Sequence, residues 1–260
     1  MLELYHWEPN TFSLKPLIAL HEKGLEFQSR YVDFLGFEQY ALPRIATDLE
    51  VRHNPEGEGP ILLHNGTAMT ESFFINLYLD EVFPERPLRA SDAASRWRVL
   101  VWARFANEVL APAISTLGSH KYLAPELKKR NRSDVEQAIA RMPTEEQRLG
   151  WRAALDNSYS DELLEDSRRK VAIAVRKVED ALENSAWLVG SSYSLADIDL
   201  FSLLHPVSAL VPGALTSAPR TSAWLKTIGD RAAVKSAFAT SRTGKPEQCF
   251  TPGPEHSRWG

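Results

Sequence analysis

Residues 59–72 have the sequence GPILLHNGTAMTES, and this stretch decides how the first part of the chain folds. Asn65-Gly66 separates two short runs of strand-forming residues, 61–64 and 67–70. Because both residues of the dipeptide tolerate a positive φ, it is the strongest short-range signal for a β-hairpin. The stretch therefore predicts two short antiparallel strands.

Both ends of this stretch carry residues with two alternative roles. Pro60 either belongs to an ordinary turn or has a cis peptide bond that turns a backbone edge outward at the start of a strand. Glu71 and Ser72 start a predicted helix over 71–82. They either complement the positive N-terminal end of that helix or bind a ligand, Glu71 an ammonium group and Ser72 a carboxylate.

The residues before the hairpin predict a strand over 2–7, a helix over 13–23 and a second strand over 27–33. Ser13 lies at the junction between the first strand and the helix. A serine at such a junction usually caps the helix, and the unpaired backbone N–H groups there also attract anions. Residues 1–83 thus predict an α/β domain in the order βαβ, hairpin, helix.

Residues 84–91, PERPLRAS, contain two prolines and few large apolar side chains, which is typical of a linker. Residues 92–260 have apolar positions at helical spacing and predict an all-helical second domain. Ser194-Leu-Ala-Asp197 has the spacing of a capping box. Residues 126–142 are polar and predict a solvated excursion between helices. Helices are expected over 92–111, 144–157, 160–185, 194–205 and 220–240.

The composition limits the class of protein. The chain has 260 residues, 43% of them hydrophobic and 25% charged, which excludes a disordered chain. The formal net charge of −4 offers no basic field, so we expect no nucleic-acid partner. Neither a secretory signal nor a membrane-spanning stretch is evident, and we expect no membrane partner. The single cysteine, Cys249, suits a reducing compartment, and we expect a cytoplasmic protein.

Several common functional motifs are missing. The seven histidines show no paired spacing, so we expect no metal site. The chain has no GxGxxG, no phosphate-binding loop of the GxxxxGK[ST] type and no GxSxG elbow. Cys249 lies in a proline-rich tail without a nearby cationic cluster, which disfavours a nucleophilic role. The candidate chemistry therefore lies in the first 72 residues.

The order of Ser13, the segment 54–60 and Glu71-Ser72 resembles the glutathione transferase superfamily. That family has a catalytic Ser, Cys or Tyr near the first helix, a cis-proline after an NPxGxVP segment, and an acidic residue followed by serine. The capping box Ser194–Asp197 matches the family's helical half. The resemblance implies a thioredoxin-like N-terminal domain, residues 1–83, and a helical domain, residues 92–260, that carries the acceptor pocket. It also implies glutathione as cosubstrate and a homodimer.

The chain looks closer still to the bacterial β-aryl-etherase type of glutathione transferase, which acts in the breakdown of lignin dimers. Its motifs are similar to Ser13-Leu-Lys-Pro16, Phe37-Glu-Gln39, Thr70-Glu-Ser72, Ser115-Thr-x-Gly118, and Pro143-x-x-Glu-Gln147 leading to Trp151-Arg152. Gly59 departs from the family pattern, which usually has Val before the cis-proline. The stretch 40–53 is longer, which leaves Gln39, Tyr40 and Arg44 as candidates for the contact with the glycine carboxylate of glutathione.

The resemblance implies a role for each site residue. The catalytic Ser13 would donate a hydrogen bond to the glutathione thiolate and so lower the thiol pKa. Gly59 would offer backbone groups to the cysteinyl unit, and Pro60 would fix that backbone edge. Glu71 would bind the γ-glutamyl ammonium and Ser72 its carboxylate. A small aromatic acceptor is expected against Trp7, Phe12 and residues from 105–122 and 147–151.

Three functions remain open at this stage. The first is a glutathione-dependent etherase, in which the thiolate displaces a phenol. The second is a broader transferase that conjugates electrophiles, removes halide or reduces peroxides. The third is a non-catalytic protein that binds ligands on the same fold, because a fold by itself does not imply catalysis. The presence of Ser13, Pro60, Glu71 and Ser72 together favours an enzyme.

Overall fold

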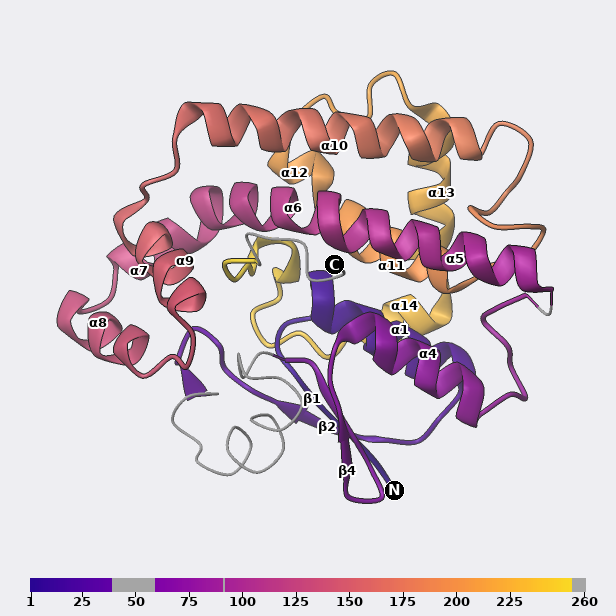
Figure 1. The fold of residues 1–260 in the computed structure, drawn as a ribbon, viewed down its shortest axis with the longest axis horizontal. Coiled ribbons are helices and arrows are strands. Elements are labelled where there is room, and N and C mark those ends of the chain that lie inside the picture. Colours follow the sequence, from indigo (N-terminus) through magenta and orange to yellow (C-terminus); the bar gives the residue numbers. More distant parts are fainter. Residues whose placement is uncertain (39–58, 91, 254–260) are drawn as a thin grey trace.

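A four-stranded sheet forms the N-terminal part of the molecule (Figure 1). The computed structural model describes residues 1–38, 59–90 and 92–253, and within them the strand order is β2-β1-β3-β4. β1 pairs with β2 in parallel and with β3 antiparallel. β3 and β4 form the predicted hairpin, with φ of 52° at Asn65 and 83° at Gly66. The strands span Leu2–His6 (β1), Gln28–Tyr31 (β2), Ile61–His64 (β3) and Thr67–Met69 (β4).

Helices α1 (Thr11–Lys23) and α4 (Ser72–Val82) pack against each other and bury apolar side chains with the sheet (Figure 1). Helix α1 begins two residues before the predicted start, and Asn10 is its N-cap residue. The interpretation of Ser13 as the N-cap is therefore wrong. Ser13 is not the N-cap because the chain turns sharply at Thr11, with φ of 43°, and this turn places Ser13 inside the first helical turn.

From residue 93 the described part of the chain forms helices joined by loops. A run of helix from 93 to 128 is interrupted by two π-helical turns, η2 and η3. The capping box before α11 is confirmed, since Asp197 accepts hydrogen bonds from the backbone N–H and the hydroxyl of Ser194 at 2.9 and 3.0 Å. The elements are α5 (Ala93–Phe105), η2 (Ala106–Leu110), α6 (Ala111–Gly118), η3 (Ser119–Leu123), α7 (Ala124–Lys128), α8 (Arg132–Ala140), α9 (Glu145–Asp156), α10 (Asp161–Ala181), α11 (Leu195–Leu204), α12 (Val207–Leu210), α13 (Pro219–Gly229), α14 (Ala232–Phe238) and η4 (Pro246–Gln248).

Two sequence-based predictions in this part are wrong. Residues 126–142 are not a solvated excursion, because α8 buries Val135 and Ile139 in a second hydrophobic cluster with α7 and α9. The sparse apolar residues of this segment recur at helical spacing, i and i+4, so they face the cluster together. The helix predicted over 220–240 is two helices, α13 and α14, which separate at Asp230-Arg231.

Helix α11 forms the centre of the main core. All ten of its residues are buried, and it packs against α1 and α5. A long apolar helix that is buried on every side needs its polar groups to be paired. Asp197 meets this need, because Leu188 N–H and Trp224 Nε1–H each donate to its Oδ1 at 3.0 Å. In the described ranges, the helices are too short or too polar to cross a bilayer.

Candidate functional site

The register of the strands brings the predicted site residues to one edge of the sheet. Tyr5 in β1 lies opposite Ile61 in β3, and β3 runs antiparallel to β4. The C-terminal ends of β1 and β4 therefore meet the N-terminal end of β3. Ser13 follows β1, Gly59-Pro60 precede β3, and Glu71-Ser72 follow β4. Backbone pairing alone thus gathers the three segments.

Ser13 is held against the loop that follows β1. Its side chain is buried, and its Oγ accepts a hydrogen bond from the Trp7 N–H at 3.2 Å. The Trp7 carbonyl lies 2.6 Å from His6 Nδ1, and His6 Nε2 lies 2.7 Å from Ser29 Oγ. Burial lowers the pKa of His6, so this ring is neutral at physiological pH. Both backbone polar groups of Trp7 are therefore paired beside Ser13.

The peptide bond between Gly59 and Pro60 is cis, as one of the two alternatives predicted. A Cβ atom at Gly59 would lie 3.0 Å from Cζ of Phe34, closer than ordinary van der Waals contact. Phe34 is buried and stacks on Trp7 with ring centroids 5.5 Å apart. The Phe34 ring thus occupies space that the side chain of the usual valine would need, which explains the departure at Gly59.

Glu71 and Ser72 lie at the start of α4. Glu71 has φ of 64° and precedes the helix, and its carbonyl accepts the hydrogen bond from Ile75 N–H. Its side chain is exposed, whereas Ser72 is buried. Glu71 thus lies at the surface beside the positive end of the helix. The candidates Gln39, Tyr40 and Arg44, and residues 54–58, lie outside the described residues.

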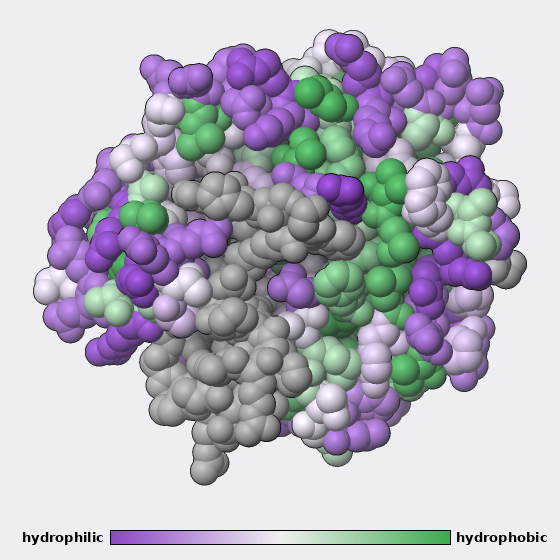
Figure 2. Space-filling view, viewed as in Figure 1, coloured by the Kyte–Doolittle hydropathy of each residue, from purple (hydrophilic) through white to green (hydrophobic). Residues whose placement is uncertain are grey.

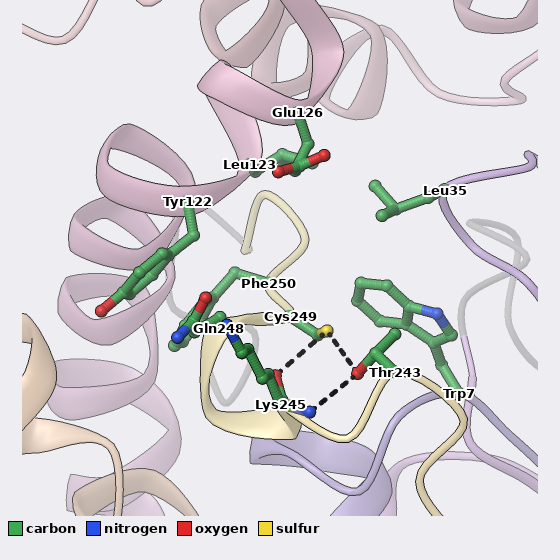
Figure 3. A pocket seen from close by; sticks show the side chains of 10 residues that line it. All are labelled: Trp7, Leu35, Tyr122, Leu123, Glu126, Thr243, Lys245, Gln248, Cys249 and Phe250. Carbon is green, nitrogen blue, oxygen red and sulfur yellow. Dashed lines mark hydrogen bonds between the residues drawn. The ribbon is translucent and has the colours of Figure 1, made fainter. Parts of the chain in front are cut away.

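A cavity of about 260 Å³ lies between three parts of the chain: the loop after β1 (residues 7–10), η3, and the C-terminal segment (residues 241–253) (Figure 3). Aromatic rings form opposite sides of it, Trp7 on one side and Tyr122 with Phe250 on the other. The last two rings stack with centroids 6.0 Å apart. Polar groups are interleaved with these rings. The lining residues are Trp7, Leu35, Tyr122, Leu123, Glu126, Thr243, Lys245, Gln248, Cys249 and Phe250.

The lining differs from the sequence-based expectation. Of the residues expected around the acceptor, Trp7 and Tyr122 line this cavity, whereas Phe12 and residues 147–151 do not. Trp151 instead packs against Phe37 in the second hydrophobic cluster, with the ring planes tilted and the centroids 5.0 Å apart. The contribution of the C-terminal segment was missed. Its only local signal is a proline-rich tail with the lone cysteine, which does not indicate where the segment docks.

The loop after β1 holds that C-terminal segment through Glu8. The carboxylate of Glu8 is fully buried and accepts hydrogen bonds from the hydroxyls of Tyr31, Ser241 and Thr243 at 2.8, 2.6 and 3.0 Å. The backbone N–H groups of Arg242 and Thr243 donate to it at 2.9 and 3.2 Å. Burial would raise the pKa of Glu8, but these hydrogen bonds outweigh it and lower the pKa. Glu8 is therefore ionised at neutral pH.

Asn10 makes a second contact with the same segment. Its Nδ2 donates to the Cys249 carbonyl at 2.7 Å, and its Oδ1 lies 2.8 Å from His205 Nε2. Burial lowers the pKa of His205 to about 3, so the neutral ring donates its Nε2–H to Asn10. The Asn10 side chain is fully engaged in these bonds, which explains why it does not cap α1 with its own oxygen.

A buried ion pair fastens α1 to the helical part of the molecule. Lys15 Nζ lies 2.5 Å from Asp199 Oδ1 on α11, and both side chains are inaccessible to solvent. Lys15 also donates to Asn107 Oδ1 in η2 at 3.1 Å. Because Lys15 lies two residues after Ser13 on α1, the pair holds this end of α1 against the helices. Among the described residues, no group of three His, Cys, Asp or Glu side chains is placed to hold a metal ion.

Comparison with protein families matches two models to this chain. The model for the N-terminal domain of glutathione S-transferase matches residues 11–82, and the model for its C-terminal domain matches residues 133–232. Protein LigF of Sphingobium sp. (strain NBRC 103272 / SYK-6) is 36% identical over 251 residues, which cover 93% of this chain and 94% of LigF. Glutathione S-transferase GstA of Escherichia coli O157:H7 is 24% identical over 241 residues, 90% of this chain and 96% of GstA.

Solved structures give the same picture. The crystal structure of the beta-etherase LigF from Sphingobium sp. strain SYK-6 superposes with a TM-score of 0.82 at 35% identity, covering 92% of this chain and 99% of that one. A glutathione S-transferase from Methylobacillus flagellatus, solved with glutathione bound, has a TM-score of 0.64 at 21% identity and covers 91% and 98% of the two chains. That second likeness concerns the fold alone.

Proposed function

Because this chain belongs to the glutathione S-transferase family, we propose that it is a glutathione-dependent β-etherase. It cleaves the β-aryl ether bond of lignin-derived aromatic dimers, with glutathione as cosubstrate. The observation that carries this proposal is the likeness to the beta-etherase LigF over nearly the whole of both chains. The aromatic cavity beside the loop after β1 supports it, because such a cavity suits an aryl group.

In the proposed reaction the sulfur of the glutathione thiolate attacks the carbon that bears the aryl ether. A carbon–sulfur bond forms, the carbon–oxygen bond breaks, and the phenolate takes up a proton from water. The Ser13 oxygen accepts from Trp7 N–H, so its own proton is available for a hydrogen bond to the thiolate. Such a bond lowers the pKa of the thiol. The remaining gain comes from holding thiolate and ether in position.

The predicted glutathione contacts fit the edge of the sheet described above. Gly59 and Pro60 present backbone at the start of β3, Glu71 offers a carboxylate for the γ-glutamyl ammonium, and Ser72 lies at the positive end of α4 for its carboxylate. We assign glutathione binding to residues 1–83 and acceptor binding to residues 92–260 together with Trp7. Residues 84–91 form the linker between the two domains in this proposal.

The test uses purified protein, glutathione and a racemic guaiacyl β-aryl ether dimer, with phenol release followed by chromatography. Glutathione-dependent release that stops at half conversion supports a stereoselective etherase. Absence of release while glutathione still binds overturns the etherase proposal. It favours the broader transferase instead, and halides, epoxides and peroxides are then the acceptors to compare.

We also propose that the protein forms a homodimer in the cytoplasm. Trp97, Leu100 and Val101 lie on one face of α5 and are 64%, 43% and 40% exposed, and Phe74 on α4 is 48% exposed. Figure 2 shows the hydrophobic strip over these two helices. Exposed apolar surface of this kind marks a protein contact. Light scattering on the unaltered protein and on Trp97→Lys tests it, since a charge in the strip converts a dimer to a monomer.

A further inference from the structure

The C-terminal strap, defined as residues 241–253, packs on α6 and α9, and glycines lie at the points of closest contact. Phe250 is 2% exposed, and a Cβ atom at Gly118 would lie 2.2 Å from its ring. A Cβ at Gly150 would lie 3.2 Å from Pro252. In the reverse sense, a Cβ at Gly253 would lie 2.6 Å from the Ser115 side chain. The motif Ser115-Thr-x-Gly118 therefore leaves room for the strap.

The same strap forms one side of the acceptor cavity. Phe250 lies opposite Trp7 (Figure 3), and Cys249 and Thr243 also line the cavity. The Cys249 thiol lies 3.5 Å from the Lys245 carbonyl and 3.6 Å from the Thr243 hydroxyl, so the strap folds back on itself at this point. Contacts of Glu8 with residues 241–243 and of Asn10 with residue 249 hold it from the side of the sheet.

We propose that Gly118 is a specificity-determining residue, because it seats Phe250 and thereby builds the wall against which the aryl group of the acceptor packs. The inference rests on the proposed function and names the part of the acceptor that the wall recognises: a flat aromatic ring that lies beside the sulfur of glutathione. Aromatic rings gain from offset or edge contacts with Trp7, Tyr122 and Phe250. An acceptor without a ring makes no such contact.

The substitution Gly118→Ala separates this wall from the rest of the site. A methyl group at 2.2 Å from a buried ring cannot be accommodated by small adjustments, so Phe250 must leave its place. The matched control is Gly229→Ala at the end of α13, where a Cβ would meet nothing within 4 Å. Both substitutions add one methyl group to a helical glycine, and circular dichroism confirms that each variant is folded.

The measurement is the affinity for two thioethers of glutathione, S-(2,4-dinitrophenyl)glutathione and S-methylglutathione, by calorimetry. We expect Gly118→Ala to weaken binding of the aryl thioether at least tenfold and of the methyl thioether less than twofold. Gly229→Ala should change neither. In a Phe250→Ala background the added methyl group has no ring to displace, so Gly118→Ala should have no further effect there, a non-additivity that a general loss of stability would not produce.

The single cysteine reports whether the strap is seated. Burial raises the pKa of the Cys249 thiol to about 11, so at pH 8 the unaltered protein reacts slowly with Ellman's reagent. Gly118→Ala should react at least ten times faster. Unchanged Cys249 reactivity in Gly118→Ala would overturn the proposal. A released strap with unchanged affinity for the aryl thioether would overturn it as well. If the unaltered protein fails to bind S-methylglutathione, the proposed function itself is wrong.

Discussion

The two sides of the site are built in different ways. At the edge of the sheet, strand register positions Gly59-Pro60 and Glu71-Ser72, and all the segments concerned lie within residues 1–83. On the side of the aromatic cavity, Glu8 and Asn10 bind residues more than 230 positions further along the chain. Backbone pairing tolerates most side-chain changes, whereas the cavity wall depends on individual side chains. The cavity side should therefore be the more sensitive to single substitutions.

The largest effect is expected where the two sides are joined, at the buried pair of Lys15 and Asp199. Lys15→Ala leaves the buried Asp199 carboxylate without its cation and should cost about 3–5 kcal/mol of unfolding free energy. The control Lys226→Ala removes an ion pair between two exposed side chains, and it should leave the unfolding free energy almost unchanged. Urea unfolding measures both. Equal costs would contradict a structural link between α1 and α11 through this pair.

A smaller effect is expected at Glu8, whose carboxylate binds residues 241–243 of the strap. Glu8→Gln keeps the shape but removes the charge from five hydrogen bonds, and should cost about 2 kcal/mol. Because folding lowers the pKa of Glu8, its ionised form stabilises the folded chain at neutral pH. That contribution is lost as the pH falls from the unfolded pKa, about 4.3, through the folded one. Hydrogen exchange of residues 241–253 between about pH 5 and pH 2 should show the change, and Glu8→Gln should abolish it.

On the glutathione side, Ser13→Ala tests the proposed hydrogen bond to the thiolate. Loss of one charge-assisted hydrogen bond should raise the pKa of bound glutathione by about one unit, equivalent to about 1.4 kcal/mol. The ultraviolet absorbance of the thiolate, titrated against pH, measures it. Ser13→Cys is a useful companion, because it keeps a weak donor. Identical titration curves for the unaltered protein and Ser13→Ala would remove Ser13 from the mechanism.

The smallest effect is expected at Gly59, where backbone groups make the contact. Gly59→Ala pushes the added Cβ against Phe34 by a few tenths of an ångström, and the proposed backbone contacts to glutathione are kept. We expect the KM for glutathione to change less than about threefold, which is under 1 kcal/mol. A tenfold or larger increase would show that the glutathione side also depends on a single close contact, and the contrast between the two sides would then fail.

Comparison of particular elements shows where sequence reasoning works. The hairpin at Asn65-Gly66 and the capping box at Ser194–Asp197 were predictable, because each depends on residues at most three positions apart. Helix α8 was not, since only its tertiary neighbours show that Val135 and Ile139 face a hydrophobic cluster. The start of α1 was also misplaced, because the turn at Thr11 follows from the loop that Glu8 and Asn10 hold.

By itself, the sequence determined the order of the described strands and helices within residues 1–83, the family to which the chain is similar and the segments that carry Ser13, Pro60, Glu71 and Ser72. Those features rest on local backbone preferences and on spacing, which can be followed along the chain. Only the tertiary structure decided that the proline-rich tail forms one wall of the aromatic cavity. That placement comes from contacts between distant residues, such as the packing of Phe250 on Gly118, and no local pattern records such a contact.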